Sequence, residues 1–205
     1  MSLYKEYGYE THTADHTQNY IWQPLLAMLQ TKSTILDLGC GNGALANELI
    51  AKDFDIYGTD ASEKGIYHAN KINPERFFVQ DLSSDDLPTE LQNKNITTII
   101  STEVIEHLYD PRGFISFAKR ILIKNGGGEI ILSTPYHGYL KNLLIAITGK
   151  WDNHADPLWD GGHIKLWSKH TLTSLLEEQG FKVTDFVGCG RLPYLWKSMI
   201  IKATI

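Results

Sequence analysis

The sequence predicts a doubly wound α/β fold, a parallel sheet with helices on both faces. Three observations predict it: short apolar runs alternate with amphipathic segments, a glycine-rich turn follows the first run, and polar or acidic residues follow several others. Right-handed crossovers bring the carboxyl ends of parallel strands to one edge, where α/β sheets bind their ligands.

The expected strands are short apolar runs bounded by polar residues or glycine. The run over 96–101 is short, carries three isoleucines and is bounded by polar residues, which is typical of a strand that helices cover on both faces. In chain order, we expect strands over 33–38, 55–59, 76–79, 96–101, 129–133, 181–187 and 199–204.

The expected helices carry apolar residues at helical spacing. Asn125 and the three glycines after it end the helix over 111–122, and Ser168 is the expected N-cap of a helix over 171–179. The full set of expected helices covers 20–29, 43–52, 62–72, 111–122, 139–148 and 171–179.

Length and composition bound the organisation and the partners. The 205 residues suit a single domain over 1–205, with 1–30 as an N-terminal lid and helix and 134–168 as an inserted lid. A formal net charge of −5, without a long run of lysine or arginine, disfavours a nucleic-acid partner.

Cysteine usage and the N-terminal sequence predict a cytoplasmic protein. Cys40 and Cys189 give neither a disulfide framework nor a metal-binding spacing, so we expect both to be reduced. The first residues lack the basic and then apolar pattern of a signal peptide, and no apolar stretch is long enough to span a bilayer.

The most informative segment is the glycine turn that ends the first strand, because glycine lets a strand-to-helix turn pass close to a ligand. An acid one βα unit later, Asp60, is placed to accept the hydroxyls of a ribose, which predicts a nucleoside-containing cofactor. Purely structural alternatives remain open for the three acids: Asp37 caps the turn, Asp60 caps the helix that follows, and Asp81 begins a loop. The turn runs from Leu36 to Gly43 as Leu-Asp-Leu-Gly-Cys-Gly-Asn-Gly.

A nicotinamide dinucleotide is the competing cofactor. Its fingerprint is G-x-G-x-x-G, whereas this chain has G-x-G-x-G preceded by Asp37. An acid at the turn repels a pyrophosphate and attracts the ammonium of a methionine-like tail. The residues therefore favour a sulfonium nucleoside over a dinucleotide.

These segments together resemble the class I S-adenosylmethionine-dependent methyltransferases, and the Glu-x-x-Glu-His segment resembles the ubiquinone-biosynthesis O-methyltransferase group. The resemblance implies a Rossmann-like, seven-stranded, mostly parallel sheet whose last strand, over 199–204, is antiparallel. It also implies S-adenosylmethionine as cofactor, with Asp60 on the ribose and Asp81 on the adenine. The motifs that carry it are Ile35 to Gly43, Gly58 to Ser62, Gln80 to Leu82 and Glu103 to Leu108, and the implied cofactor-binding residues are Asp37, Gly39, Cys40, Gly41, Gly43, Asp60, Ala61, Asp81, Leu82 and Thr102.

Glu103, Glu106 and His107 are the candidates for chemistry at the acceptor, because their spacing places them on one side of a starting helix. With His163, the best match for a later ligand in the resembling enzymes, they form a candidate site for a divalent metal such as magnesium. Two alternatives remain: His107 or His163 acts as a metal-free base beside Glu106, or the acids only complement the start of a helix.

Aromatic residues crowd the segment between the fifth strand and the following helix, and Trp151, Trp159 and Trp167 are its tryptophans. Such an aromatic-rich lid favours a pocket for a planar or sugar-like acceptor. Its helix over 139–148 has an apolar stripe, which either faces the core or contacts a lipid surface or a second subunit. Only Lys141 and Lys150 flank it, so support for membrane contact is weak, and nothing indicates the oligomeric state.

The function predicted from these features is S-adenosylmethionine-dependent O-methylation of a small hydroxylated acceptor. Glu106, His107 and His163 are the expected catalytic residues. The alternatives are a pseudo-enzyme that binds S-adenosylmethionine as a sensor, a nicotinamide-dependent oxidoreductase and, disfavoured by the acidic balance, an RNA methyltransferase.

Overall fold

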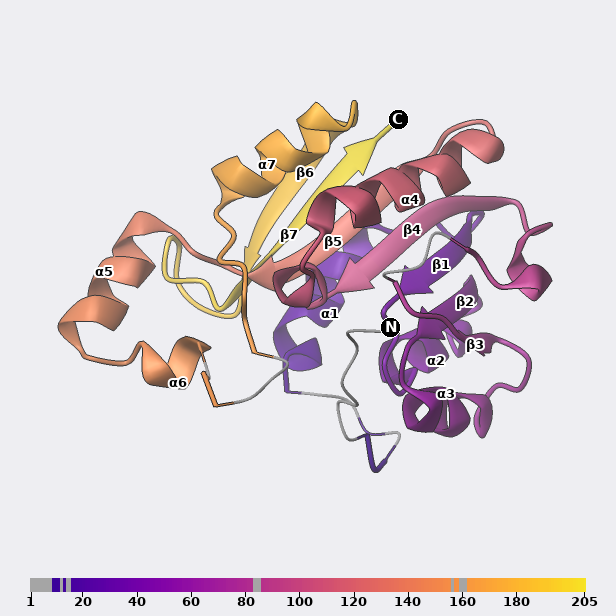
Figure 1. Cartoon of the computed structure of the whole chain (residues 1–205), viewed down its shortest axis with the longest axis horizontal. Helices are drawn as coiled ribbons and strands as arrows, with labels where there is room; N and C mark the ends of the chain where they lie inside the picture. The colour runs from indigo at the N-terminus through magenta and orange to yellow at the C-terminus, as the bar shows by residue number, and fades with distance from the viewer. Residues whose placement is uncertain (1–8, 12, 14–15, 83–85, 156, 159–161) are drawn as a thin grey trace.

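The structure, a computed structural model, describes residues 9–11, 13, 16–82, 86–155, 157–158 and 162–205. Its centre is a seven-stranded sheet in the order β3-β2-β1-β4-β5-β7-β6 (Figure 1). The strands are β1 (Thr34–Leu38), β2 (Asp55–Asp60), β3 (Phe77–Val79), β4 (Ile96–Thr102), β5 (Glu129–Pro135), β6 (Lys182–Cys189) and β7 (Ser198–Thr204).

The sheet is mostly parallel. β1 pairs in parallel with β2 and β4, and the parallel pairing continues to β3 on one side and β5 on the other. β7 runs antiparallel to both β5 and β6. The predicted fold class and the antiparallel last strand are therefore confirmed, and each strand lies within two residues of its predicted ends at both termini.

Helices cover both faces of the sheet (Figure 1). The buried apolar side chains form two clusters, one on each face of the sheet. The first cluster contains the apolar side chains of α4 and α7, and the second contains those of α1, α2 and α3. The helices are α1 (Gln18–Met28), α2 (Ala44–Ile50), α3 (Glu63–Asn70), α4 (Pro111–Lys124), α5 (Tyr139–Ile147), α6 (Asp152–Ala155) and α7 (Lys169–Glu178), and two 3₁₀ turns are η1 (Thr89–Leu91) and η2 (Ile105–His107).

The central strands are apolar on both faces because helices bury both sides. Successive isoleucines of β4 divide between the two clusters, Ile99 in the first and Ile100 in the second, and both are fully buried. Each such side chain contributes about 1.5–3 kcal/mol of burial. The strand ends of the candidate site are thereby fixed on a rigid frame.

The segment after β5 leaves the sheet and forms α5 and α6 at one end of the molecule (Figure 1). The apolar stripe of α5, Leu140, Leu143, Leu144 and Ile147, is exposed, with Leu143 at 40% and Ile147 at 72%. The alternative of a core-facing stripe is therefore wrong, because α5 projects past the sheet edge instead of packing on it. The one buried residue of this helix is Lys141. No helix among the described residues is both long enough and apolar enough to span a bilayer.

Candidate active site

A cavity of about 1160 Å³ lies at the carboxyl ends of the parallel strands. The predicted cofactor residues reach it from β1, β2 and β4 and from the segment that follows β3. Those in its wall are Asp37, Gly39, Cys40, Gly41, Asp60, Ala61, Asp81, Leu82 and Thr102. Gly43 is not in the wall: it is the N-cap of α2, and a Cβ there would collide with Ala69.

The turn after β1 requires glycine for two physical reasons. Gly39 has φ +83°, in the left-handed region that side chains rarely adopt. A Cβ added to it would also lie 2.5 Å from Cγ2 of Val104. The backbone N–H groups of Gly39 and Cys40 both donate to the carbonyl of Thr59, which ties the turn to β2.

Asp37 is a buried carboxyl group that suits a cationic ligand. Its side chain is 1% exposed, and among the described residues its Oδ1 has no hydrogen-bond partner. Burial, and then the charge of Asp60, raise the pKa of Asp37 to about 8. A cation placed against Oδ1 would stabilise the ionised form, as expected for the ammonium group of a methionine-like tail.

Asp60 ends β2 and faces the same cavity. Its Oδ2 accepts from the backbone N–H of Gly41 at 2.8 Å, and its Oδ1 accepts from Ser62 at 2.8 Å. The N-cap of α3 is Ser62, whose side chain accepts from the N–H of Gly65, so Asp60 supports the turn before this helix and does not cap it. The hydrogen bonds of Asp60 are compatible with ribose binding, because each carboxylate oxygen has more than one acceptor site.

Part of the predicted N-terminal lid contacts the glycine turn, although none of its residues was predicted to bind the cofactor. The Asn42 side chain donates to the carbonyls of Thr11 and Thr13 at 2.8 and 2.9 Å. Tyr9 also lines the cavity, and a Cβ on Gly41 would lie 2.5 Å from its hydroxyl oxygen. The described part of the predicted N-terminal lid therefore borders the cofactor side of the cavity.

Glu103 is not on a helix with Glu106 and His107, contrary to the predicted spacing argument. It precedes η2 with φ +55°, and only the three residues Ile105–His107 form that turn. Its carboxylate accepts from Ser133 at 2.8 Å and from Ser198 at 3.2 Å, which ties it to β5 and β7. Burial raises its pKa to about 7. Glu103 lies outside the group of potential metal ligands that the structure brings together.

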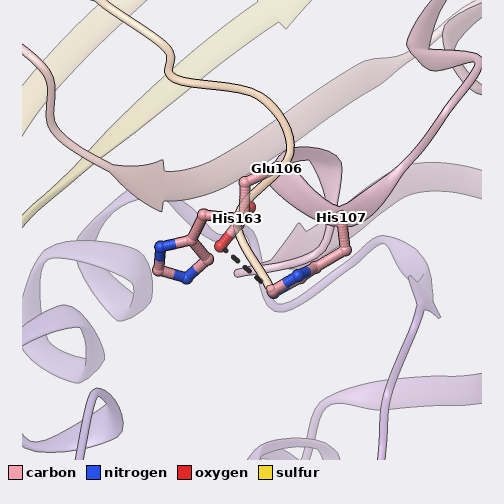
Figure 2. A group of neighbouring side chains, drawn as sticks. All are labelled: Glu106, His107 and His163. Atoms are coloured by element: carbon pink, nitrogen blue, oxygen red, sulfur yellow. Dashed lines mark ion pairs between the residues drawn. The ribbon is translucent and has the colours of Figure 1, made fainter. Parts of the chain in front are cut away.

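That group consists of Glu106, His107 and His163, whose ligand atoms all lie within 4.8 Å of one another. Figure 2 shows the Glu106 carboxylate between the two imidazoles. Glu106 is 1% exposed, and its Oε2 accepts from Thr134 at 3.0 Å. Its Oε1 lies 3.8 Å from Nε2 of His107 and has no hydrogen-bond partner among the described residues. Burial first, and then Glu103, raise the pKa of Glu106 well above its usual value.

Backbone carbonyls orient both histidines. Nδ1 of His107 lies 3.2 Å from the carbonyl of Gly162, and Nδ1 of His163 lies 3.1 Å from that of His154. A carbonyl oxygen only accepts, so Nδ1 carries the hydrogen in each ring, and Nε2 of the neutral ring keeps a lone pair. Metal-binding histidines commonly show this arrangement.

A second pair of histidines, His137 and His154, lies next to His163, which contacts the His154 carbonyl. Nε2 of His154 lies 2.9 Å from Nε2 of His137, whose Nδ1 contacts the Asn142 side chain at 3.1 Å. Burial first, and then neighbouring positive groups, lower the pKa of both rings to about 4, so both are neutral near pH 7. The pair links α6 to the start of α5.

Several wall residues carried no signal in the sequence, because distant segments bring them to the cavity. They include Tyr20 on α1, Lys141 on α5, His154 on α6, and Arg191, Lys197 and Ser198 before and at the start of β7. Trp159, predicted for the aromatic lid, lies outside the described residues. Closure of the predicted lid over an acceptor stays a prediction.

The fold and the cavity define the class: an α/β domain with a glycine turn and an acid placed for a nucleoside cofactor. Residues 13–185 match the methyltransferase domain family. Among curated proteins, the chain is similar to a probable S-adenosylmethionine-dependent methyltransferase of Mycolicibacterium smegmatis, with 29% identity over 154 residues, which cover 75% of this chain and 54% of that protein. It is also similar to a ubiquinone biosynthesis O-methyltransferase of Dinoroseobacter shibae, with 29% identity over 163 residues, 75% of this chain and 62% of that protein.

Among solved structures, the chain superposes on a magnesium protoporphyrin IX methyltransferase from Synechocystis PCC 6803 with bound SAH. The TM-score is 0.62 at 21% identity, over 90% of this chain and 78% of that one, and this likeness concerns the fold. The chain belongs to the methyltransferase domain family. The predicted resemblance and the predicted cofactor, S-adenosylmethionine, are confirmed, and the nicotinamide alternative finds no support. The chain spans 54% and 62% of the two curated relatives' lengths.

Proposed function

We propose that the chain transfers the methyl group of S-adenosylmethionine to a hydroxyl group of a small acceptor, assisted by a divalent cation held by Glu106, His107 and His163. One observation carries the proposal: these three side chains converge within 4.8 Å in the wall of the cavity that Asp37 and Asp60 also line. The methyl donor and the acceptor would therefore bind in the same cavity.

The three side chains fit a metal ion on their own chemistry. Glu106 offers a buried carboxylate oxygen without a hydrogen-bond partner among the described residues, and both histidines offer Nε2. A cation would offset the burial that raises the pKa of Glu106. Two imidazoles beside one carboxylate favour a transition-metal ion over the magnesium expected from the resemblance.

The chemistry requires alignment and the loss of one proton. S-adenosylmethionine supplies an activated methyl group, so the chain mainly aligns donor and acceptor, which removes roughly 7–11 kcal/mol of the barrier. A divalent cation lowers the pKa of an acceptor hydroxyl that it binds. Without a cation, Nε2 of His107 or His163 would accept the proton, and this metal-free base is the second candidate mechanism.

The acceptor hydroxyl is inferred from two supports. The Dinoroseobacter shibae relative is named an O-methyltransferase. A cavity in which two imidazoles lie beside a buried acid also suits an acceptor hydroxyl, which must lose a proton. A small acceptor is in keeping with the net charge of −5, which disfavours nucleic acid.

Transfer of a radiolabelled methyl group to catechols and other phenols tests the proposal. We expect activity that chelation abolishes and that manganese, cobalt or zinc ions restore. His163→Ala should lower transfer at least 100-fold and leave S-adenosylmethionine binding unchanged. The control His170→Ala, at an exposed histidine on α7, should change neither transfer nor binding.

Three results separate the alternatives. Full activity after chelation, with loss in the His163→Ala variant, selects the metal-free base. Normal cofactor binding with no transfer to any acceptor selects the sensor. Unchanged transfer in the His163→Ala variant refutes the metal site and the assignment of His163 as the base, and leaves His107 as the candidate base.

A further inference from the structure

Helix α5 buries a lysine while it exposes its leucines. Lys141 is 7% exposed and lies in the wall of the active-site cavity, whereas Leu143 and Leu144, on the same helix, are 40% and 41% exposed. The Lys141 Nζ donates to the carbonyl of Lys197 at 2.9 Å. A lysine on an exposed helix normally keeps its ammonium group in water, so its inward position is unexpected for a purely structural residue.

Two more cationic side chains line the same cavity. Arg191 and Lys197 belong to the segment between β6 and β7, which carries them to the acceptor side. The Nζ of Lys197 lies 5.0 Å from the ring centre of Tyr20. Within the described part of the chain, the Arg191 guanidinium forms no hydrogen bond or ion pair. Three cations thus face one space.

Close to Lys141, one protein carboxylate faces this positive charge, and the other acids of the cavity wall are Asp37, Asp60, Asp81, Glu106 and Asp110. Glu103 is the acid that interacts electrostatically with Lys141, and Ser133 and Ser198 already donate to its two oxygens. Even with Glu103 ionised, the three cations outnumber it. Burial first, and then Arg191, lower the pKa of Lys141 to about 8, as expected for an ammonium group held away from water beside like charge.

A buried ammonium group is stable only when an anion or several acceptors pair with it. The cavity is large enough for a second molecule beside the cofactor, and its wall carries both the cationic group and the Glu106, His107 and His163 cluster. An anionic group on a molecule that binds next to that cluster would therefore stabilise the ammonium group of Lys141.

We propose that the methyl acceptor carries an anionic group, a carboxylate or a phosphate, bound by Lys141, Arg191 and Lys197. The proposal rests on the proposed function, because it describes the acceptor of that same site. It narrows the substrate class from hydroxylated small molecules to anionic ones, such as hydroxylated aromatic acids or phosphate esters.

Binding of unreactive analogues tests the anion site independently of turnover. Calorimetry with SAH present compares 3,4-dimethoxybenzoate, 3,4-dimethoxyphenylphosphonate and the uncharged 1,2-dimethoxybenzene. The variants are Lys141→Met, which keeps the length of the side chain, and Arg191→Gln at an exposed position. Lys150→Met, an exposed lysine just after α5, removes the same charge outside the cavity and is the matched control.

We expect one of the anionic analogues to bind at least 10-fold more tightly than the neutral one, and the preferred anion distinguishes a carboxylate from a phosphate. Arg191→Gln and Lys141→Met should each reduce that preference at least 5-fold, and Lys150→Met should leave it unchanged. Arg191→Gln alone decides the matter if Lys141→Met fails to fold.

Equal binding of charged and neutral analogues, or an unchanged preference in Arg191→Gln, overturns the proposal. The transfer assay is read separately with 3,4-dihydroxybenzoate and catechol. If the anionic analogue binds more tightly but neither compound is methylated, the anion site is supported and O-methylation is rejected. If both compounds are methylated at equal rates, O-methylation is supported and the anion site is rejected.

Discussion

Asp37→Asn should stabilise the cofactor-free protein at alkaline pH and weaken cofactor binding. The carboxyl group of Asp37 is buried, and burial raises its pKa from 3.8 to about 8. Between these two values the folded state holds a proton that the unfolded state has released. The free energy of unfolding therefore falls as pH rises through this window.

The magnitude follows from the size of the shift. A difference of about four pKa units at 1.36 kcal/mol per unit corresponds to roughly 5–6 kcal/mol lost above pH 8. Asparagine does not ionise, so the variant lacks this loss. The stability gap between variant and wild type should widen by about 3–4 kcal/mol from pH 5 to pH 8.

Urea unfolding of both proteins at several pH values, without ligand, measures this gap. The control is Asp185→Asn, which removes a carboxylate from an exposed position on β6. Calorimetry with S-adenosylmethionine at pH 8 measures the functional cost. We expect the variant to bind S-adenosylmethionine at least 30-fold more weakly than the wild type, since losing one partner of a buried charge pair costs about 2–5 kcal/mol.

Parallel stability curves for wild type and the Asp37→Asn variant would refute the buried-acid argument. Wild-type affinity for the cofactor in the variant would refute the assignment of Asp37 to the ammonium group. The two results are independent, so one part of the reasoning can fail while the other stands.

Three further experiments test the fold by substitution. Gly39→Ala should lower the free energy of unfolding by about 1–3 kcal/mol, because of its positive φ and the contact with Val104, and circular dichroism during urea unfolding checks this. By the same measurement, Ile147→Ser on exposed α5 should stay within about 0.5 kcal/mol, whereas Leu172→Ala in the core should cost about 2–5 kcal/mol, and equal effects would contradict the assigned burial. Ser168→Ala should cost about 0.5–2 kcal/mol through loss of the capping box of α7, with Ser168→Asp as the variant expected to retain stability.

The strands and the glycine turn could be predicted because local pattern decides them. An apolar run such as 96–101 is buried wherever it lies in an α/β sheet, and Gly39 serves a turn between adjacent elements. The predicted cofactor side followed from the same logic, since strand ends meet at one edge. Of the ten predicted cofactor residues, only Gly43 lies outside the cavity wall.

The acceptor side could not be derived in the same way, because contacts between distant segments decide it. The spacing of Glu103 and Glu106 fits a helix, yet the serines of β5 and β7 hold Glu103 in a left-handed turn before η2. The apolar stripe of α5 fits a core helix, but the sheet ends before it. Lys141 looked like a flanking surface charge, but it is buried and donates to the carbonyl of Lys197, which is far from it in the sequence.

Because β7 is antiparallel, different strands form the two sides of the cavity at the carboxyl ends of the parallel strands. Parallel strands deliver their last residues to this edge, whereas β7 delivers its first, Ser198, paired with Pro135 at the end of β5. The loop over 190–197 that precedes it can therefore change in length or charge without disturbing the glycine turn. We expect exchange of this loop between relatives to alter the part of the cavity wall that Arg191 and Lys197 form and to leave the glycine turn unchanged.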